Sequence, residues 1–288
     1  MIDPLQPAHQ VAVITRLTLR EAQRRRMLWL GLGLGLAFVA LFATGYYFAH
    51  ADFQQQVERN ASLIRQADLF NSMFLSAGLY VVNFLIVMIT ALTTVGAVSA
   101  EIDSDTIHAI AAKPIRRWEI VLGKWLGHTL MAVVYTTLLA AGVMLSVYAI
   151  SGYATPSGGS VLLILILESL AVLSVTLLGS TLLSTLANGV AVFMLYGLAF
   201  VGGWVEQIGA VLDSQTAVDL GIASSLLMPS EALWRYAAGL MQRSSSFNMP
   251  VSPFSVTSQP TPAAVVYAGA YTLALLLGAM WAFSRRDF

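Results

Sequence analysis

The sequence predicts an all-α integral membrane protein with six transmembrane helices. Of its 288 residues, 57% are hydrophobic and 10% are charged, and the mean hydropathy is +0.75. Soluble domains carry charge on about a quarter of their residues, so this composition excludes a soluble fold. Six apolar segments reach the roughly 20 residues that a helix needs to cross the hydrocarbon core. They cover residues 27–49, 73–99, 125–150, 161–186, 189–209 and 263–283 of one domain, 1–288.

Residues 1–26 predict an N-terminal elbow helix that lies in the membrane interface. Val11 and Ile14 fall on one side of such a helix, and Arg16 and Arg20 fall on the other. An apolar face opposite a basic face suits the boundary between headgroups and acyl chains. The apolar run that follows is longer than the roughly 7 to 15 residues of a secretory signal peptide, so we expect it to remain as the first span.

The basic residues predict the orientation. With the N-terminus in the cytoplasm, 11 of the 15 Lys and Arg residues lie on the cytoplasmic side. Because basic loops stay inside, both termini are expected to be cytoplasmic, in the plasma (inner) membrane of a bacterium or archaeon. The formal net charge of zero gives no indication of nucleic acid as a partner, and the absence of cysteine excludes thiolate metal sites.

Residues 100–124, between spans two and three, predict a short charged helix on the cytoplasmic side. Acids precede it and favour its positive end, and a basic residue lies at its negative end, before Pro114 stops it. Lys124 and Trp125 then stand where cations and indoles anchor a membrane interface. The residues expected to make contacts from this stretch are Glu101, Asp103, Asp105, Ile107, His108, Ile110, Lys113 and Arg116.

Residues 205–262 predict an outer helical insertion between spans five and six. Its first half is apolar enough to lie on the membrane or to re-enter it. Pro229 precedes a helix with an apolar stripe that includes Leu233 and Ala237, with Trp234 beside it.

No catalytic motif is present in the sequence. It contains no GxxxxGK[ST] phosphate loop, no HExxH zinc motif and no GxSxG nucleophile elbow. The run from Gly31 to Gly35 lies inside a span, so it indicates close helix packing rather than a nucleotide loop. We therefore predict no enzyme activity, no metal site and no cofactor in this chain.

Two polar residues lie inside the predicted spans. Glu168 is the one ionisable residue expected well inside a span, and Asn83 lies at a comparable depth in span two. A buried carboxyl costs several kcal/mol unless it is paired, neutral or hydrated, which favours a role in a transport path. A structural hydrogen bond to a neighbouring helix, Asn83 included, is the other interpretation.

The stretch EIDSDTIHAIAAKPIRRWEIVLGKWLG resembles the signature of the type-2 ABC transporter permeases, and SSLLMPSEALWR extends the likeness to the insertion. The resemblance implies that the helix of residues 100–124 is a coupling helix that grips a separate ABC ATPase. It also implies ATP-driven export by a pair of permease copies, as a homodimer or a heterodimer, with two ATPase copies that bind ATP and Mg²⁺. Spans two and five are expected to line the substrate path.

An ATP-independent secondary transporter or channel is the alternative. Such proteins usually show inverted repeats or several charges near the membrane midplane. The sequence shows neither feature, which favours the exporter.

The absence of native cysteine makes the predicted orientation testable. Single cysteines at Ser62, Ser157 and Ser245 should react with a membrane-impermeant maleimide in intact cells, whereas one at Ser104 should not. The reason is the excess of basic residues on the side of Ser104. Labelling of Ser104 from outside would reverse the orientation.

Overall fold

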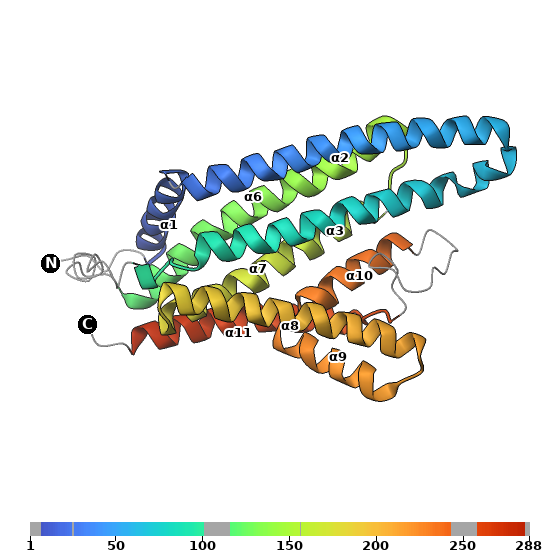
Figure 1. The fold of residues 1–288 in the computed structure, drawn as a ribbon. Helices are drawn as coiled ribbons and strands as arrows, with labels where there is room; N and C mark the ends of the chain where they lie inside the picture. Colours follow the sequence, from blue (N-terminus) through green and yellow to red (C-terminus); the bar gives the residue numbers. More distant parts are fainter. Residues whose placement is uncertain (1–6, 25, 101–115, 156, 243–257, 286–288) are drawn as a thin grey trace.

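A computed structural model of the chain describes residues 7–24, 26–100, 116–155, 157–242 and 258–285. Figure 1 shows long helices that run side by side, with α1 lying across one end of the bundle. Within these ranges the regular structure is entirely helical, and six helices are long and apolar enough to cross a membrane. The predicted fold class and the number of spans are thus confirmed.

The six long helices are α2 (Arg26–Arg59), α3 (Ala67–Thr94), α6 (Arg117–Ser151), α7 (Gly158–Leu182), α8 (Thr185–Val211) and α11 (Ala263–Ser284). The shorter elements are α1 (Pro7–Arg24), the 3₁₀ helix η1 (Ala61–Gln66), α9 (Gln215–Leu227) and α10 (Ser230–Gln242). Some predicted bounds are wrong. The first span continues as helix to Arg59, the second ends at Thr94 instead of residue 99, and the turn between spans four and five lies at Leu183 and Ser184 instead of Ala187 and Asn188.

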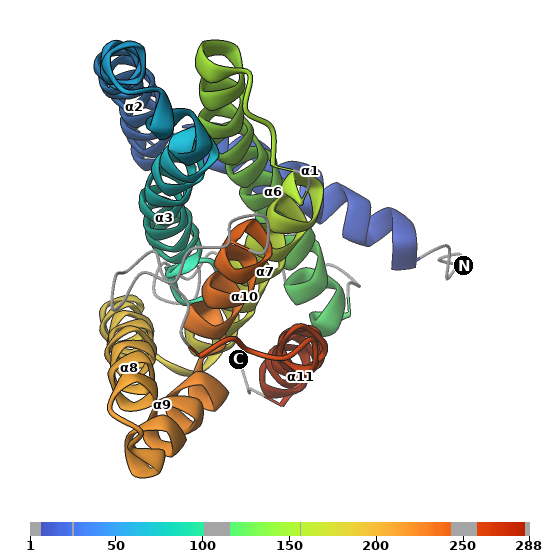
Figure 2. The ribbon, with the colours of Figure 1, turned by 90° about the vertical axis from the view of Figure 1, so that its right-hand side faces the viewer.

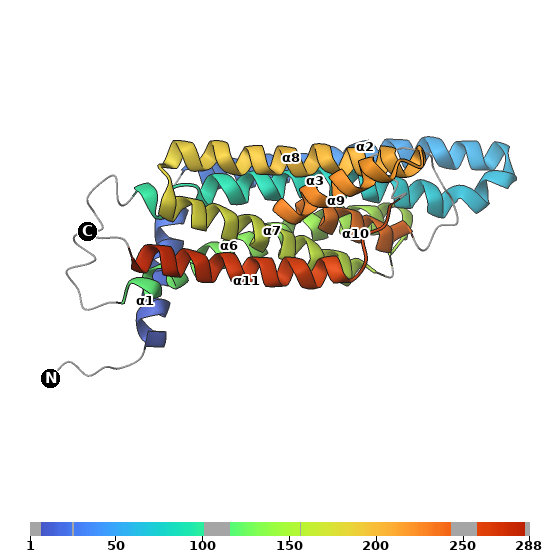
Figure 3. The ribbon, with the colours of Figure 1, turned by 90° about the horizontal axis from the view of Figure 1, so that it is seen from below.

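Helix α1 and the last turn of α11 lie at the same end of the bundle, which we call the terminal end (Figure 3). The opposite end, where α2 leads through η1 into α3, is the distal end. An even number of spans requires this arrangement. The described α1 has a buried face of Val11, Ile14, Thr18 and Ala22, which agrees with the predicted amphipathic pattern.

Helix α7 is the inner helix of the bundle. It packs against α3, α6, α8, α10 and α11, and Figure 2 shows it among these helices when the bundle is viewed from the distal end. Of its most apolar 18 residues, 61% are buried, compared with 6% for α2. A turn at Gly152 allows α6 and α7 to pack against each other, because its φ of 72° is a conformation that glycine adopts without strain.

The predicted insertion contains two helices. Helix α9 folds back along α8, and α10 packs against α7. Small residues permit the α8–α9 contact, since a side chain at Gly202 would meet Ser224 and one at Gly209 would meet Ala217. Pro229 immediately precedes α10, as predicted, and Leu233, Trp234 and Ala237 are buried against the bundle.

Candidate functional site

The predicted contact residues fall mostly on a segment outside the described residues. Glu101, Asp103, Asp105, Ile107, His108, Ile110 and Lys113 all lie within residues 101–115. Arg116 is described, and so is the chain immediately before and after this segment. The terminal end therefore shows how both ends of the segment join the bundle.

The chain before residue 101 is tied to the turn between α7 and α8. The backbone N–H groups of Val98 and Ser99 both donate to Ser180 Oγ, at 2.9 and 3.0 Å. Ser99 Oγ lies 2.7 Å from Thr185 Oγ1, within hydrogen-bond distance. Since Val98, Ser99 and Ser180 are buried, water competes little for these bonds. A displacement of this part of the chain would thus act on α7 and α8 together.

Asn188 completes this junction from the first turn of α8. Its fully buried amide nitrogen donates to Val95 O at 2.8 Å and to Thr176 O at 2.9 Å, joining three helical segments. The Asn188 side chain lies against Gly179, where a Cβ atom would collide with it. Asn188 therefore belongs to the first turn of α8, where its side chain points into the bundle, and the helix break lies before it.

The chain after residue 115 joins the bundle through a capped helix. The Glu119 carboxylate accepts from the backbone N–H of Arg116 at 3.0 Å, and Glu119 N donates to Arg116 O at 2.9 Å. This reciprocal pair satisfies backbone groups that the first turn of α6 would leave unpaired. Glu119 is 2% exposed, so α6 begins in a protected position.

Lys124 and Trp125 face inward, contrary to their predicted position as interface anchors. Lys124 is only 5% exposed, and Trp125 Nε1 donates to Ser174 Oγ of α7 at 3.0 Å. Lys124 is buried because α1 covers this part of α6. A Cβ atom on Gly123 would lie 2.7 Å from Ile14, and one on Gly127 would lie 2.8 Å from Thr18. Two glycines thus allow α1 to lie directly on α6.

The two predicted intramembrane polar residues are both buried, on α3 and α7. Asn83 is 4% exposed and Glu168 is 0% exposed. Asn83 lies beside Glu168, and Glu231 of α10 is close enough to interact with it electrostatically. Neither Glu168 oxygen has a hydrogen-bond partner among the described residues, and the same is true of Asn83 Oδ1. The structure thus brings Asn83 and Glu168 together, as both interpretations require.

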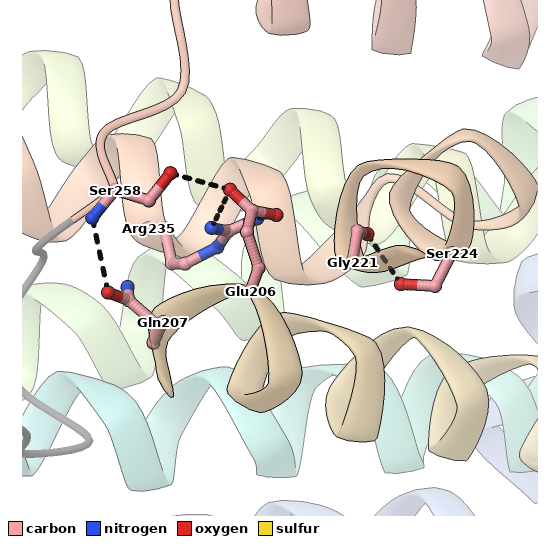
Figure 4. Close-up of polar contacts among 6 residues, drawn as sticks. All are labelled: Glu206, Gln207, Gly221, Ser224, Arg235 and Ser258. Atoms are coloured by element: carbon pink, nitrogen blue, oxygen red, sulfur yellow. Dashed lines mark hydrogen bonds and ion pairs between the residues drawn. The ribbon is translucent and has the colours of Figure 1, made fainter. Parts of the chain in front are cut away.

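A second set of buried charges, which the sequence does not predict, lies on α8 and α10. Glu206, Glu231 and Arg235 are 3%, 9% and 3% exposed. Figure 4 shows Arg235 directed at Glu206: Nη2 donates to Oε2 at 2.7 Å, and Nη1 lies 2.6 Å from Oε1. In the sequence, Arg235 is only one of the four basic residues on the predicted outer side, and no motif singles out Glu206. Their spacing of 29 residues gives no local signal that they pair.

The chain leading into α11 forms a further hydrogen bond to this ion pair. Ser258 Oγ donates to Glu206 Oε1 at 2.7 Å, and Ser258 N donates to Gln207 Oε1 at 3.2 Å (Figure 4). A side chain at Gly203 would collide with Glu231, so α8 and α10 are in direct contact here. The insertion is therefore fastened to α8 at a point close to Glu168.

The buried charges do not balance in this region. Glu168, Glu206 and Glu231 provide three carboxyl groups, and Arg235 provides the one guanidinium among the described buried residues near them. A second carboxylate in a low-dielectric site is costly without a proton, a cation or water to offset it. The described residues contain no group of three or more His, Cys, Asp or Glu side chains that could hold a metal ion.

Comparison with known families identifies a match over nearly the whole chain. The model of the ABC-2 family transporter protein matches residues 15–288. The chain belongs to the ABC-2 transporter family. Comparison with curated proteins finds no match.

Membership of the ABC-2 family establishes the broad role of the chain. It is a multi-pass membrane protein of the permease type, and its family implies an ABC ATPase as partner in the membrane. The resemblance inferred from the stretch Glu101–Gly127 and from the insertion is thereby confirmed.

The contacts of Arg235 predict how this ABC-2 permease depends on its buried ion pair. Arg235→Ala leaves Glu206 buried without its counter-charge, and breaking a buried pair typically costs about 3–5 kcal/mol. We expect a clear fall in the thermal unfolding midpoint of the purified protein. Arg59→Ala, which changes an exposed arginine at the distal end, is the control and should have little effect.

Removing both charges with Glu206→Gln and Arg235→Met should recover part of that loss, because residue 206 then no longer carries a buried charge without its partner. Equal unfolding midpoints for Arg235→Ala and Arg59→Ala would show that the ion pair does not hold the insertion.

Proposed function

We propose that the chain is the membrane subunit of an ATP-driven exporter, in which two permease copies form the substrate path and two separate ABC ATPase subunits supply the energy. Residues 101–115 make the ATPase contact in this proposal, on the cytoplasmic side together with both termini. The observation that carries the proposal is the fixed attachment of the chain on both sides of that segment.

The attachment gives a direct mechanical route. A push on residues 101–115 would act on α7 and α8 through Ser99 and Ser180, and on α6 through the cap formed by Glu119. Hydrogen-bonded junctions on rigid helices transmit displacement, whereas a loosely attached loop would dissipate it. Helix α7 then extends this motion to the region of Glu168, where the insertion meets the bundle.

A double variant tests the proposed ATPase contact. Ile107→Asp with Glu101→Ala places a charge in a contact that must lose water and removes an acid from the start of the predicted helix. Loss of such a contact centre costs about 2 kcal/mol or more, so binding of the partner ATPase should weaken by roughly 30-fold. The measurement is the amount of ATPase that co-purifies with the permease, together with its ATP turnover.

The matched control makes the same chemical changes at the distal end. Ile64→Asp with Glu58→Ala alters an exposed isoleucine and an exposed acid and should leave the complex intact. Wild-type complex formation and ATP turnover in the Ile107 and Glu101 variant would refute the contact, and with it the main support for an ATP-driven exporter.

Glu168 provides a test of the transport path. Glu168→Ala should leave the permease assembled but change transport or its dependence on pH, because it removes a titratable group from the proposed path. Transport through the wild-type and variant complexes in proteoliposomes, measured across a range of pH, checks this. Identical transport at every pH would assign Glu168 a purely structural role.

A further inference from the structure

A cavity of about 620 Å³ lies near the terminal end, between α1, α2, α3 and α6. Its volume is in the range of ligand pockets in general. Most of its lining is aliphatic or aromatic. The lining residues are Leu19, Gln23, Leu28, Trp29, Leu32, Ile89, Thr90, Thr93, His128, Leu130, Met131, Ala132, Val134 and Tyr135.

Polar side chains in the lining are mostly directed at helix carbonyls. Thr93 Oγ1 donates to Ile89 O at 2.7 Å, and Tyr135 donates to Gly31 O at 3.1 Å. His128 Nδ1 lies 2.9 Å from Lys124 O. Because these groups are engaged with backbone, the cavity presents a largely apolar wall, which suits a hydrocarbon chain better than a polar solute.

The rim of the cavity lies on the outer surface of the helix bundle. Trp29, Leu130 and Val134 are 59%, 49% and 59% exposed, and they belong to α2 and α6. Both helices are membrane spans, and α2 is the least covered of the six found among the described residues. Lipid acyl chains therefore have direct access to the cavity between these two helices.

Three arginines lie close in the chain to residues that line the cavity. Arg20 and Arg24 follow the lining residues Leu19 and Gln23 on α1, and Arg26 begins α2. All three are exposed, and none forms an ion pair with another described residue. Trp29 Nε1 donates to Gln23 O at 2.8 Å and holds the end of α1 close to the start of α2. An apolar slot thus opens beside a cluster of unpaired positive charge.

We propose that this cavity binds one acyl chain of an anionic phospholipid, whose phosphate headgroup pairs with Arg20, Arg24 and Arg26. From Arg26 to Leu32, α2 rises about 9 Å, which places the headgroup at the membrane interface and the acyl chain in the hydrocarbon region. The bound lipid fills the space between α1 and the spans. This proposal does not depend on the cargo of the permease.

Native mass spectrometry of the purified full-length chain tests the proposal. The probes are phosphatidylglycerol and phosphatidylcholine with identical acyl chains. Wild-type protein should retain phosphatidylglycerol more strongly. Arg24→Gln with Arg26→Gln should reduce phosphatidylglycerol affinity about fivefold per arginine while leaving phosphatidylcholine binding unchanged, since each basic residue near an anionic headgroup contributes a similar amount. The control is Arg59→Gln, at the distal end, which should behave as wild type.

A second variant tests the acyl slot. Ala132→Phe places a ring in the cavity and should abolish retention of both lipids, whereas Leu145→Phe, an exposed position on the same helix, should not. Equal affinity of wild-type protein for the two lipids would overturn the proposal. Full lipid retention in Ala132→Phe would also overturn it. If Ala132→Phe instead separates two copies of the chain and still retains lipid, the cavity is an interface between copies and the proposal is wrong. If Ala132→Phe fails to fold, the exposed arginine pair decides the outcome alone.

Discussion

The bundle depends on enclosing its polar side chains between helices, because hydrocarbon offers them no hydrogen-bond partners. Helix α7 illustrates this constraint. Its sequence reads as almost continuously apolar, yet its buried residues include Glu168, Ser169, Ser174, Thr176, Ser180 and Thr181. Such a helix is stable in a membrane only when other helices surround it. The position of α7 at the centre and of α2 at the periphery follows from this difference in composition.

The same constraint gives the two ends of the bundle different characters. At the terminal end, where Glu119 and Lys124 are also buried, hydroxyl, amide and indole side chains form neutral hydrogen bonds that fix α3, α6, α7 and α8 to one another. In the distal half, the buried polar groups include the three carboxyl groups of Glu168, Glu206 and Glu231, which outnumber the one guanidinium near them. A neutral network favours a rigid frame, whereas an unbalanced charged cluster changes energy whenever water, a proton or a ligand reaches it. This contrast is consistent with the proposal that the terminal end receives force from an ATPase.

The sequence was sufficient for the fold class, the six spans and the insertion helices, because each of these depends on local composition and periodicity, and the resemblance of Glu101–Gly127 to a known signature was sufficient for the family. It was also sufficient to predict that Asn83 and Glu168 lie inside the spans, since polar residues within an apolar run are conspicuous. It did not reveal the pairing of Glu206 with Arg235, which depends on how α10 folds back onto α8. Nor did it reveal that Lys124 faces inward, because the covering by α1 is a tertiary contact made through Gly123 and Gly127. The helix break at Leu183 was misplaced for a similar reason: Asn188 resembles a turn residue, but its side chain bonds to two other segments.

The division of labour between this permease and a separate ATPase can be tested by photolabelling. The permease is purified together with its partner ATPase, irradiated with an azido derivative of ATP in the presence of Mg²⁺, and separated into subunits. Label that excess ATP competes away should be found on the ATPase subunit and not on the permease, since the permease sequence contains no phosphate-binding loop. Specific label on the permease chain itself would contradict a role limited to forming the path and receiving force.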